Sequence, residues 1–261
     1  MNLAALLQLP PQGLAVFLLV LVRASAIFLS APVLGNANVP ARAKVGLSAL
    51  LALILTPMMM QTPLAADLTS GWSLLPAVLS ELMLGILIGL MAQLFFVAVQ
   101  FAGQIVGLQM GFGMASVFDP AMQSQVSATA QFYLLLGVLM FLLLDGHHWV
   151  LVALGQSFQA IPLGGFRFDA VALGTLLDAA TNMFWVATMI MAPVLGVLVL
   201  GEVAMAIVAR IMPQMNVFVA AFPVKIFLGV LTMALSFPLL TGYLQGETEH
   251  TFAAILRFLT H

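Results

Sequence analysis

Charged side chains lie so far apart in this chain that they leave six apolar stretches, each long enough to cross a lipid bilayer. Five stretches contain no charge and a sixth contains only Arg23; they are residues 14–34, 45–66, 82–118, 120–144, 179–201 and 226–246. The hydrocarbon core of a bilayer is ~30 Å thick and needs ~20 helical residues to cross it. The sequence therefore predicts an all-α integral membrane protein with about six long hydrophobic helices.

The composition supports the same class of protein. Only 6% of the 261 residues are charged and 63% are hydrophobic, whereas a soluble domain carries about 25% charged residues. No charge run or Gly/Ser linker divides the chain, so residues 1–261 are predicted to form a single domain. Cysteine is absent, which excludes disulfides, thiolate catalysis and cysteine-based metal sites. A net charge of -2 provides no basic surface for nucleic acid.

Two segments depart from this pattern of spans. The first 28 residues carry no basic n-region and place Arg23 inside the apolar run, so they do not resemble a cleavable signal peptide, and we expect the first helix to be retained. Residues 145–178 contain only a shorter apolar run, 149–162. Runs of about 10 to 14 residues more often lie at the membrane interface than span it, and we expect an interfacial or re-entrant piece there.

Prolines lie within or beside the last two apolar stretches, at Pro193, Pro213, Pro223 and Pro238. Each removes a backbone donor and tends to kink or end a helix. Broken helices persist at membrane depth only where neighbouring protein or water satisfies the freed carbonyls. The sequence therefore predicts several broken or kinked helices, packed as hairpins, in a chain that needs partner subunits.

Three charges, Arg23, Glu81 and Glu202, lie inside or next to these apolar stretches. On insertion scales each would cost at least ~2.5 to 3.5 kcal/mol at the centre of a bilayer unless it is paired or faces water. A structural ion pair, a snorkelling side chain, a contact between subunits and a proton or ion relay are all compatible with the sequence. A relay usually concentrates several acids in one neighbourhood, and these charges are widely spread.

Regularly spaced glycines predict close helix packing. Gly85 and Gly89 form one small-xxx-small pair, and Gly103, Gly107 and Gly111 repeat at intervals of four. On a helix, residues four apart share a face, so the missing side chains would allow two backbones to approach closely.

A competing interpretation makes residues 111–118 a loop between two helices. Asp119 followed by Pro120 suits an N-cap and first helical position, so a new helix is predicted to start there. Methionine is unbranched and adapts to irregular surfaces, which suits a soft seal around a varying cargo. Neutral hydrogen-bonding side chains surround this loop, namely Gln100, Gln104, Gln109, Gln123 and Gln125.

Other chemical motifs are weak. The segment GFGMAS resembles half of a dinucleotide fingerprint, but no strand precedes it and the third glycine is missing. There is no P-loop. Asp145, His147 and His148 suggest a metal site, yet adjacent histidines on a regular helix point about 100° apart, so a helix end with interfacial histidines is favoured. The sequence predicts no catalytic, cofactor or metal site, and no enzyme activity.

Three blocks together resemble a known family. GQIVGLQMGFGMASVFDP, DGHHWVLVALGQSFQAIPLG and ARIMPQMNVFVAAFPVKIFLG are similar to the FliR family, the flagellar members of a group shared with virulence type III secretion export gates. The match covers roughly residues 15–245, and its PQMNVF and DGHH blocks are specific.

The resemblance implies a single-copy subunit of a helical, pore-forming export gate in the bacterial inner membrane, within the flagellar basal body. FliP and FliQ chains would complete the pore, FlhB would contact it, and FlhA would lie nearby. In that family the hydrophobic helices assemble largely above the bilayer plane, so the predicted helices need not all cross it. The plug loop of the family maps onto residues 107–122.

We therefore expect passive gating. Glycines would fold the loop into the lumen, bulky residues would occlude it, and displacement would admit an unfolded flagellar substrate; the candidate plug and pore residues are Gly107, Gln109, Met110, Gly111, Phe112, Gly113, Met114 and Asp119. A second set is expected to form a helix break or partner contact: Arg210, Pro213, Gln214 and Asn216. A secondary transporter or ion channel is the alternative function, although no internal repeat supports it.

Overall fold

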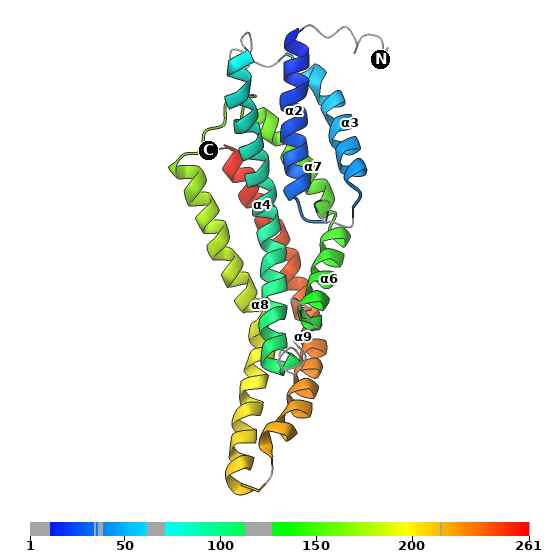
Figure 1. The fold of residues 1–261 in the computed structure, drawn as a ribbon. Coiled ribbons are helices and arrows are strands. Elements are labelled where there is room, and N and C mark those ends of the chain that lie inside the picture. The colour runs from blue at the N-terminus through cyan, green and yellow to red at the C-terminus, as the bar shows by residue number, and fades with distance from the viewer. Residues whose placement is uncertain are drawn as a thin grey trace. The chain divides into compact units, whose positions relative to one another are not determined.

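The computed structural model describes residues 11–33, 35, 39–61, 71–112, 127–214 and 216–260. They form seven helices and no strand (Figure 1): α2 (Pro11–Ser30), α3 (Ala41–Met59), α4 (Gly71–Met110), α6 (Ala128–Leu143), α7 (Gly146–Ala160), α8 (Ala170–Ile211) and α9 (Val217–Thr260). The predicted all-α fold is confirmed.

Among the described residues, five helices are long and apolar enough to cross a membrane, and α6 with α7 counts as a sixth candidate if the pair is one broken span. This agrees with the prediction of about six. The longest helices exceed their predicted spans: α4, α8 and α9 have 40, 42 and 44 residues. Each continues through a charged residue that bounded the apolar stretch, such as Glu81 in α4 and Lys225 in α9, because a charge interrupts hydropathy without interrupting backbone hydrogen bonding.

The four prolines that were expected to kink or end helices differ in whether a helix continues through them. Pro193 lies inside α8, and Pro223 and Pro238 lie inside α9, without ending either helix. Of these four prolines, Pro213 alone lies outside a helix, just after the end of α8 at Ile211. The segment predicted to be interfacial or re-entrant contains a 15-residue helix, α7, which follows α6 after a break at Asp145, a residue with φ of 54°.

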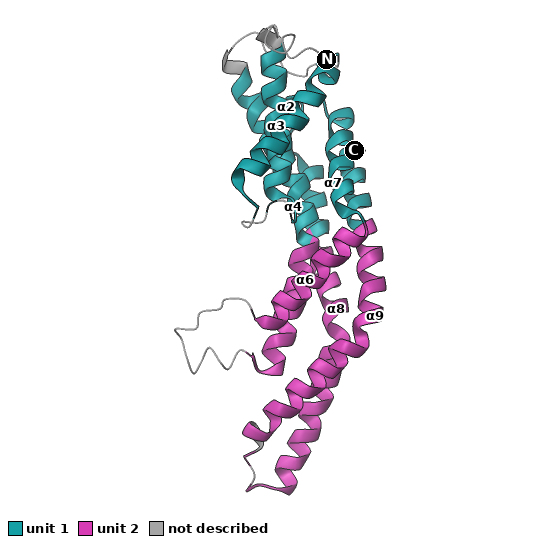
Figure 2. Ribbon diagram, turned by 90° about the vertical axis from the view of Figure 1, so that its right-hand side faces the viewer, with its two compact units in different colours: residues 1–94, 145–179, 250–261 teal, residues 95–144, 180–249 magenta. Residues whose placement is uncertain are grey.

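The chain divides into two compact units, which are coloured separately in Figure 2. Unit 1 comprises residues 1–94, 145–179 and 250–261, and unit 2 comprises residues 95–144 and 180–249. The helices α4, α8 and α9 contribute residues to both. This division describes how densely residues contact one another and does not define separately folding domains. The single domain of residues 1–261 therefore stays a prediction.

Unit 1 is built on α2, which packs against α3. Fully buried side chains of α2 include Leu19, Val20 and Ile27. Leu84 of α4 and Ile255 of α9 are also fully buried in this unit. An aromatic pair, Trp149 and Phe252, adds a stacked contact with ring centroids 6.2 Å apart.

Unit 2 has a core in which α4 meets α8 and α9. Val106 and Met110 of α4 are buried with Val194 and Leu198 of α8. Partly buried side chains pack around this cluster: Met191, Ile226, Leu228 and Met233. The core therefore lies at the C-terminal end of α4, just before the segment that the sequence singles out.

Candidate functional site at the end of helix α4

Gly111 is the first residue after α4 and has a φ of 93°, a conformation that L side chains rarely adopt. Its N–H donates to the Leu108 carbonyl at 3.0 Å. A Cβ at this position would lie 2.5 Å from Cε1 of Phe222 on α9. Both the backbone and the neighbouring ring therefore require glycine. Gly111 ends the helix and does not extend the predicted glycine stripe, which stops at Gly107.

Met110, the last residue of α4, is fully buried in the core of unit 2. A Cβ at Gly229 on α9 would lie 2.7 Å from the Cγ, Sδ and Cε atoms of Met110, so this side chain occupies space that the glycine leaves free. The sequence suggested that Met110 faces a lumen, whereas here it anchors α4 to α9. Gly229 was not among the candidate residues, because nothing in the sequence pairs it with Met110.

Phe112 is the last residue described before residue 127, and 38% of it is exposed. Gly113, Met114 and Asp119 lie outside the described residues, as does the helix start predicted at Asp119 and Pro120. The next described helix, α6, begins at Ala128, where the Ser127 hydroxyl accepts a hydrogen bond from Ala130 N–H at 3.1 Å.

Two stripe glycines of α4 lie against the start of α6. A Cβ at Gly103 would be 2.7 Å from Cα of Ala130. A Cβ at Gly107 would collide with Oγ1 of Thr129 and lie 2.8 Å from Oγ of Ser127. The side chain of Gln104 accepts a hydrogen bond from Ser127 N–H at 3.2 Å. The two backbones therefore approach closely just before the end of α4.

The other glycine pair, Gly85 and Gly89, faces α2 within unit 1. A Cβ at Gly85 would lie 2.5 Å from Cβ of Ala26 and 2.9 Å from the Arg23 carbonyl oxygen. A Cβ at Gly89 would collide with the Ser30 side chain. These glycines serve the packing of α4 on α2.

The charges inside the apolar stretches form ion pairs in the described part of the chain. Arg23 pairs with Glu81 in unit 1, and Glu202 pairs with Lys225 in unit 2. The same Glu202 oxygen, Oε1, accepts a hydrogen bond from Gln109 Nε2 at 3.0 Å. Of the alternatives that the sequence leaves open, the structural ion pair is the one present here.

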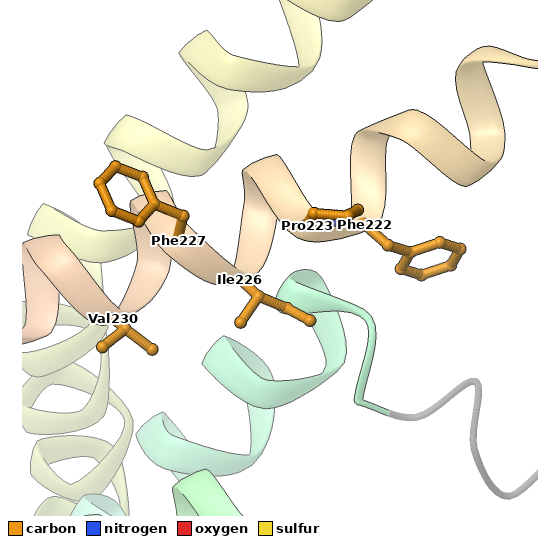
Figure 3. A pocket seen from close by; sticks show the side chains of 5 residues that line it. All are labelled: Phe222, Pro223, Ile226, Phe227 and Val230. Carbon is orange, nitrogen blue, oxygen red and sulfur yellow. The ribbon is translucent and has the colours of Figure 1, made fainter.

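A shallow apolar groove lies on α9 beside the end of α4. It is lined by Phe222, Pro223, Ile226, Phe227 and Val230. Figure 3 shows the Ile226 side chain directed toward the last turns of α4 and Phe227 directed away from them. Ile226 packs against the core cluster that contains Met110, so one edge of this groove is continuous with the anchor of α4.

The second set of candidate residues lies at the turn between α8 and α9. Arg210 is in the last turn of α8, where a cation interacts favourably with the helix dipole. Pro213 and Gln214 are exposed in the turn. Asn216 caps α9: its Oδ1 accepts from Val219 N–H at 3.3 Å and its backbone oxygen from Ala220 N–H at 3.1 Å. These residues therefore shape a helix break, and their partner contacts stay a prediction.

Asp145, His147 and His148 lie together at the start of α7, with Asp145 as the residue before the helix and both histidines in its first turn. Their ligand atoms are all within 4.8 Å of one another, and the two histidine rings have centroids 4.2 Å apart. Asp145 Oδ1 lies 3.3 Å from His148 Nδ1 and 4.0 Å from His147 Nε2, so the carboxylate is within ion-pair distance of both rings. The cluster is largely exposed and lies at the N-terminus of α7, whose positive dipole end disfavours a cation.

Comparison with known proteins gives consistent matches over most of the chain. Residues 14–251 match the family described as bacterial export proteins, family 1. The flagellar biosynthetic protein FliR of Pectobacterium carotovorum subsp. carotovorum is 30% identical over 239 residues, covering 91% of this chain and 88% of that protein. FliR of Escherichia coli K12 is 31% identical, covering 92% and 89%. FliR of Bacillus subtilis 168 is 36% identical over 216 residues, covering 80% and 81%.

Proposed function

This chain belongs to the bacterial export protein family 1 and is a membrane-embedded component of flagellar export, and we propose that it forms part of the protein-conducting gate itself. In this proposal it is a non-enzymatic subunit in the bacterial inner membrane, within the basal body. It assembles with FliP and FliQ, with FlhB and FlhA nearby, into a pore for unfolded flagellar proteins. The support is the family membership together with the construction of the α4 end.

Exposed apolar surface supports the need for partners. Large side chains on α8 and α9 remain uncovered in the chain alone; Ile211, Leu235 and Leu239 are 73%, 71% and 76% exposed. Such surface is covered in a membrane by lipid or by other helices. The groove on α9 at Phe222 and Phe227 is apolar, which suits a helix of a partner subunit as its cover.

We propose that the segment beginning at Gly111 supplies the plug. The observation that carries this is the fixed exit of the chain from α4: Met110 is anchored in the core, Gly111 turns the backbone, and Phe112 is left partly exposed. A seal requires a firm base from which a deformable segment projects. Gly113, Met114 and Asp119 belong to this proposal by sequence alone.

Transport through this gate would be passive. Displacement of the plug would admit an unfolded chain, and energy would come from elsewhere in the apparatus. Met110 is assigned to the base of the plug instead of its tip, because its side chain is enclosed by α4, α8 and α9.

The test is to delete residues 111–115 and co-express the chain with FliP and FliQ. We expect a particle of normal mass that leaks small ions when reconstituted in vesicles, because the seal is lost. An assembled particle with an unchanged barrier would refute the plug. Ion conductance by the wild-type chain alone, reconstituted without partners, would instead favour the secondary transporter or ion channel.

A further inference from the structure

Three helices of unit 2 meet at one carboxylate oxygen. Glu202 Oε1 on α8 accepts from Lys225 Nζ on α9 and, at 3.0 Å, from Gln109 Nε2 on α4. The carboxylate is partly exposed, with 39% of the Glu202 side chain and 23% of the Lys225 side chain accessible. This oxygen therefore joins α8 to α9 through an ion pair, and it joins α4 to both helices through a hydrogen bond from an uncharged amide.

We propose that Gln109 is a positioning residue which, through Glu202 and Lys225, holds the end of α4 in the sealed arrangement. We call Gln109, Glu202 and Lys225 the latch. This inference rests on the proposed gate function and assigns a role within it to three residues that precede the plug segment in α4 or lie on α8 and α9.

Gln109 is the first of three consecutive residues that hold the end of α4 in place. Met110 follows directly and inserts into the core at Gly229, and Gly111 then turns the chain against Phe222. Three consecutive residues thus hold the helix end by a polar contact, an apolar contact and a backbone turn. The apolar contact is nonspecific in direction, whereas a hydrogen bond to a fixed oxygen defines the rotation and register of α4.

The two bonds to Glu202 differ in what their loss would do. Lys225 pairs with the carboxylate, so removing it leaves an unpaired, partly exposed charge between α8 and α9, at a smaller cost than breaking a fully buried pair. Gln109 carries no charge, so removing its amide leaves the ion pair intact and frees only α4. Gln109 is therefore the part of the latch that can open without dismantling the α8–α9 pair.

Gln109→Leu tests this because it removes the donor and leaves an apolar side chain, one atom shorter, at the same helix position. We expect a particle with FliP and FliQ of normal mass and a rise in ion leak of roughly tenfold, the shift that loss of one hydrogen bond to a charged group produces. The matched control is Gln93→Leu, at an exposed position of the same helix, which should leave the barrier unchanged.

An exchange variant provides the second test. Gln109→Lys with Lys225→Gln keeps one cation and one neutral donor facing Glu202 and swaps the helices that carry them. We expect this double variant to assemble and to seal within a few-fold of the wild type, whereas Lys225→Gln alone should impair assembly.

Each outcome decides the proposal. An intact Gln109→Leu particle without added leak overturns the latch, as does an equal leak from Gln93→Leu. If Gln109→Leu fails to assemble, the exchange variant provides the decisive result. A sealed particle formed by the exchange variant supports the latch, whereas a leaking particle or a failure to assemble overturns it. A wild-type chain that forms no sealed particle with FliP and FliQ would refute the gate function, which is a separate result.

Discussion

Arg23 on α2 and Glu81 on α4 form an ion pair in which neither side chain is exposed to solvent. Arg23 Nη2 donates to Glu81 Oε1 at 2.9 Å, and Nη1 donates to the carbonyl oxygens of Ser157 at 2.8 Å and Ile161 at 3.2 Å. Glu81 Oε1 also accepts from Gly164 N–H at 2.7 Å. The pair therefore joins α2 and α4 to the end of α7 and the turn after it.

Replacing one partner of this pair should destabilise unit 1 strongly. Glu81→Leu leaves the Arg23 guanidinium buried without its counter-charge, and breaking a buried pair in this way costs about 3–5 kcal/mol. We expect a clear fall in the unfolding temperature of the purified complex in detergent. Glu81→Gln, which retains an acceptor of the same shape, should lose less.

The double variant Arg23→Met with Glu81→Leu separates charge from hydrogen bonding. It buries no charge, so it should be more stable than Glu81→Leu. It should not reach the wild type, because the Ile161 carbonyl and the Gly164 N–H lose these side-chain partners. Both groups are only partly buried, so each should cost less than the about 1–3 kcal/mol of a fully buried unsatisfied group. A double variant as unstable as Glu81→Leu would show that the unpaired charge is not the source of the destabilisation.

Gly85 should not tolerate even alanine. The added Cβ would lie 2.5 Å from Cβ of Ala26 and 2.9 Å from the Arg23 carbonyl, and overpacking of this kind typically costs about 1–3 kcal/mol. Gly174→Ala is the matched control, since nothing lies within 4 Å of a Cβ there and alanine favours helix. We expect Gly85→Ala to lower the unfolding temperature and Gly174→Ala to hold or raise it. Equal responses would show that close approach is not what Gly85 provides.

The sequence predicts the class of fold well because hydropathy and length need no tertiary information. It fails to predict helix ends in α4 and α8, where Glu81 and Glu202 find buried or partly buried partners far along the chain. An ion pair of this kind lowers the free-energy cost of placing a charge in an apolar helix. That cost was the reason for ending each predicted helix at the charged residue.

It is equally hard to predict from the sequence which face of such a helix is buried. When nearly every side chain is apolar, periodicity does not distinguish a core position from an exposed one. Met110 and Phe112 therefore looked equivalent in the sequence, yet the first is fully buried and the second partly exposed. Gly111 fitted both a helix stripe and a loop, and only its φ of 93° shows that it ends the helix.

Gly111→Ala should disturb the exit from α4 for two separable reasons. A non-glycine residue at positive φ costs roughly 1–2 kcal/mol, and the new Cβ would press on the Phe222 ring. Adding Phe222→Leu should relieve the second cost and leave the first. We expect partial recovery of the unfolding temperature and of flagellar export in the double variant. Full recovery would mean that the backbone conformation at Gly111 is not a constraint.

A disulfide between positions 110 and 229 should lock the end of α4 to α9. Cγ of Met110 lies 2.7 Å from a Cβ built on Gly229; since a Cβ–Cγ bond is about 1.5 Å long, the two Cβ atoms are at most about 4.2 Å apart, which is close enough for a disulfide to bridge them. The chain has no other cysteine to compete. For Met110→Cys with Gly229→Cys, we expect oxidation to block export and a reductant to restore it. The single-cysteine variants should not respond to oxidant. A cross-linked double variant that exports normally would show that the end of α4 does not move when the gate opens.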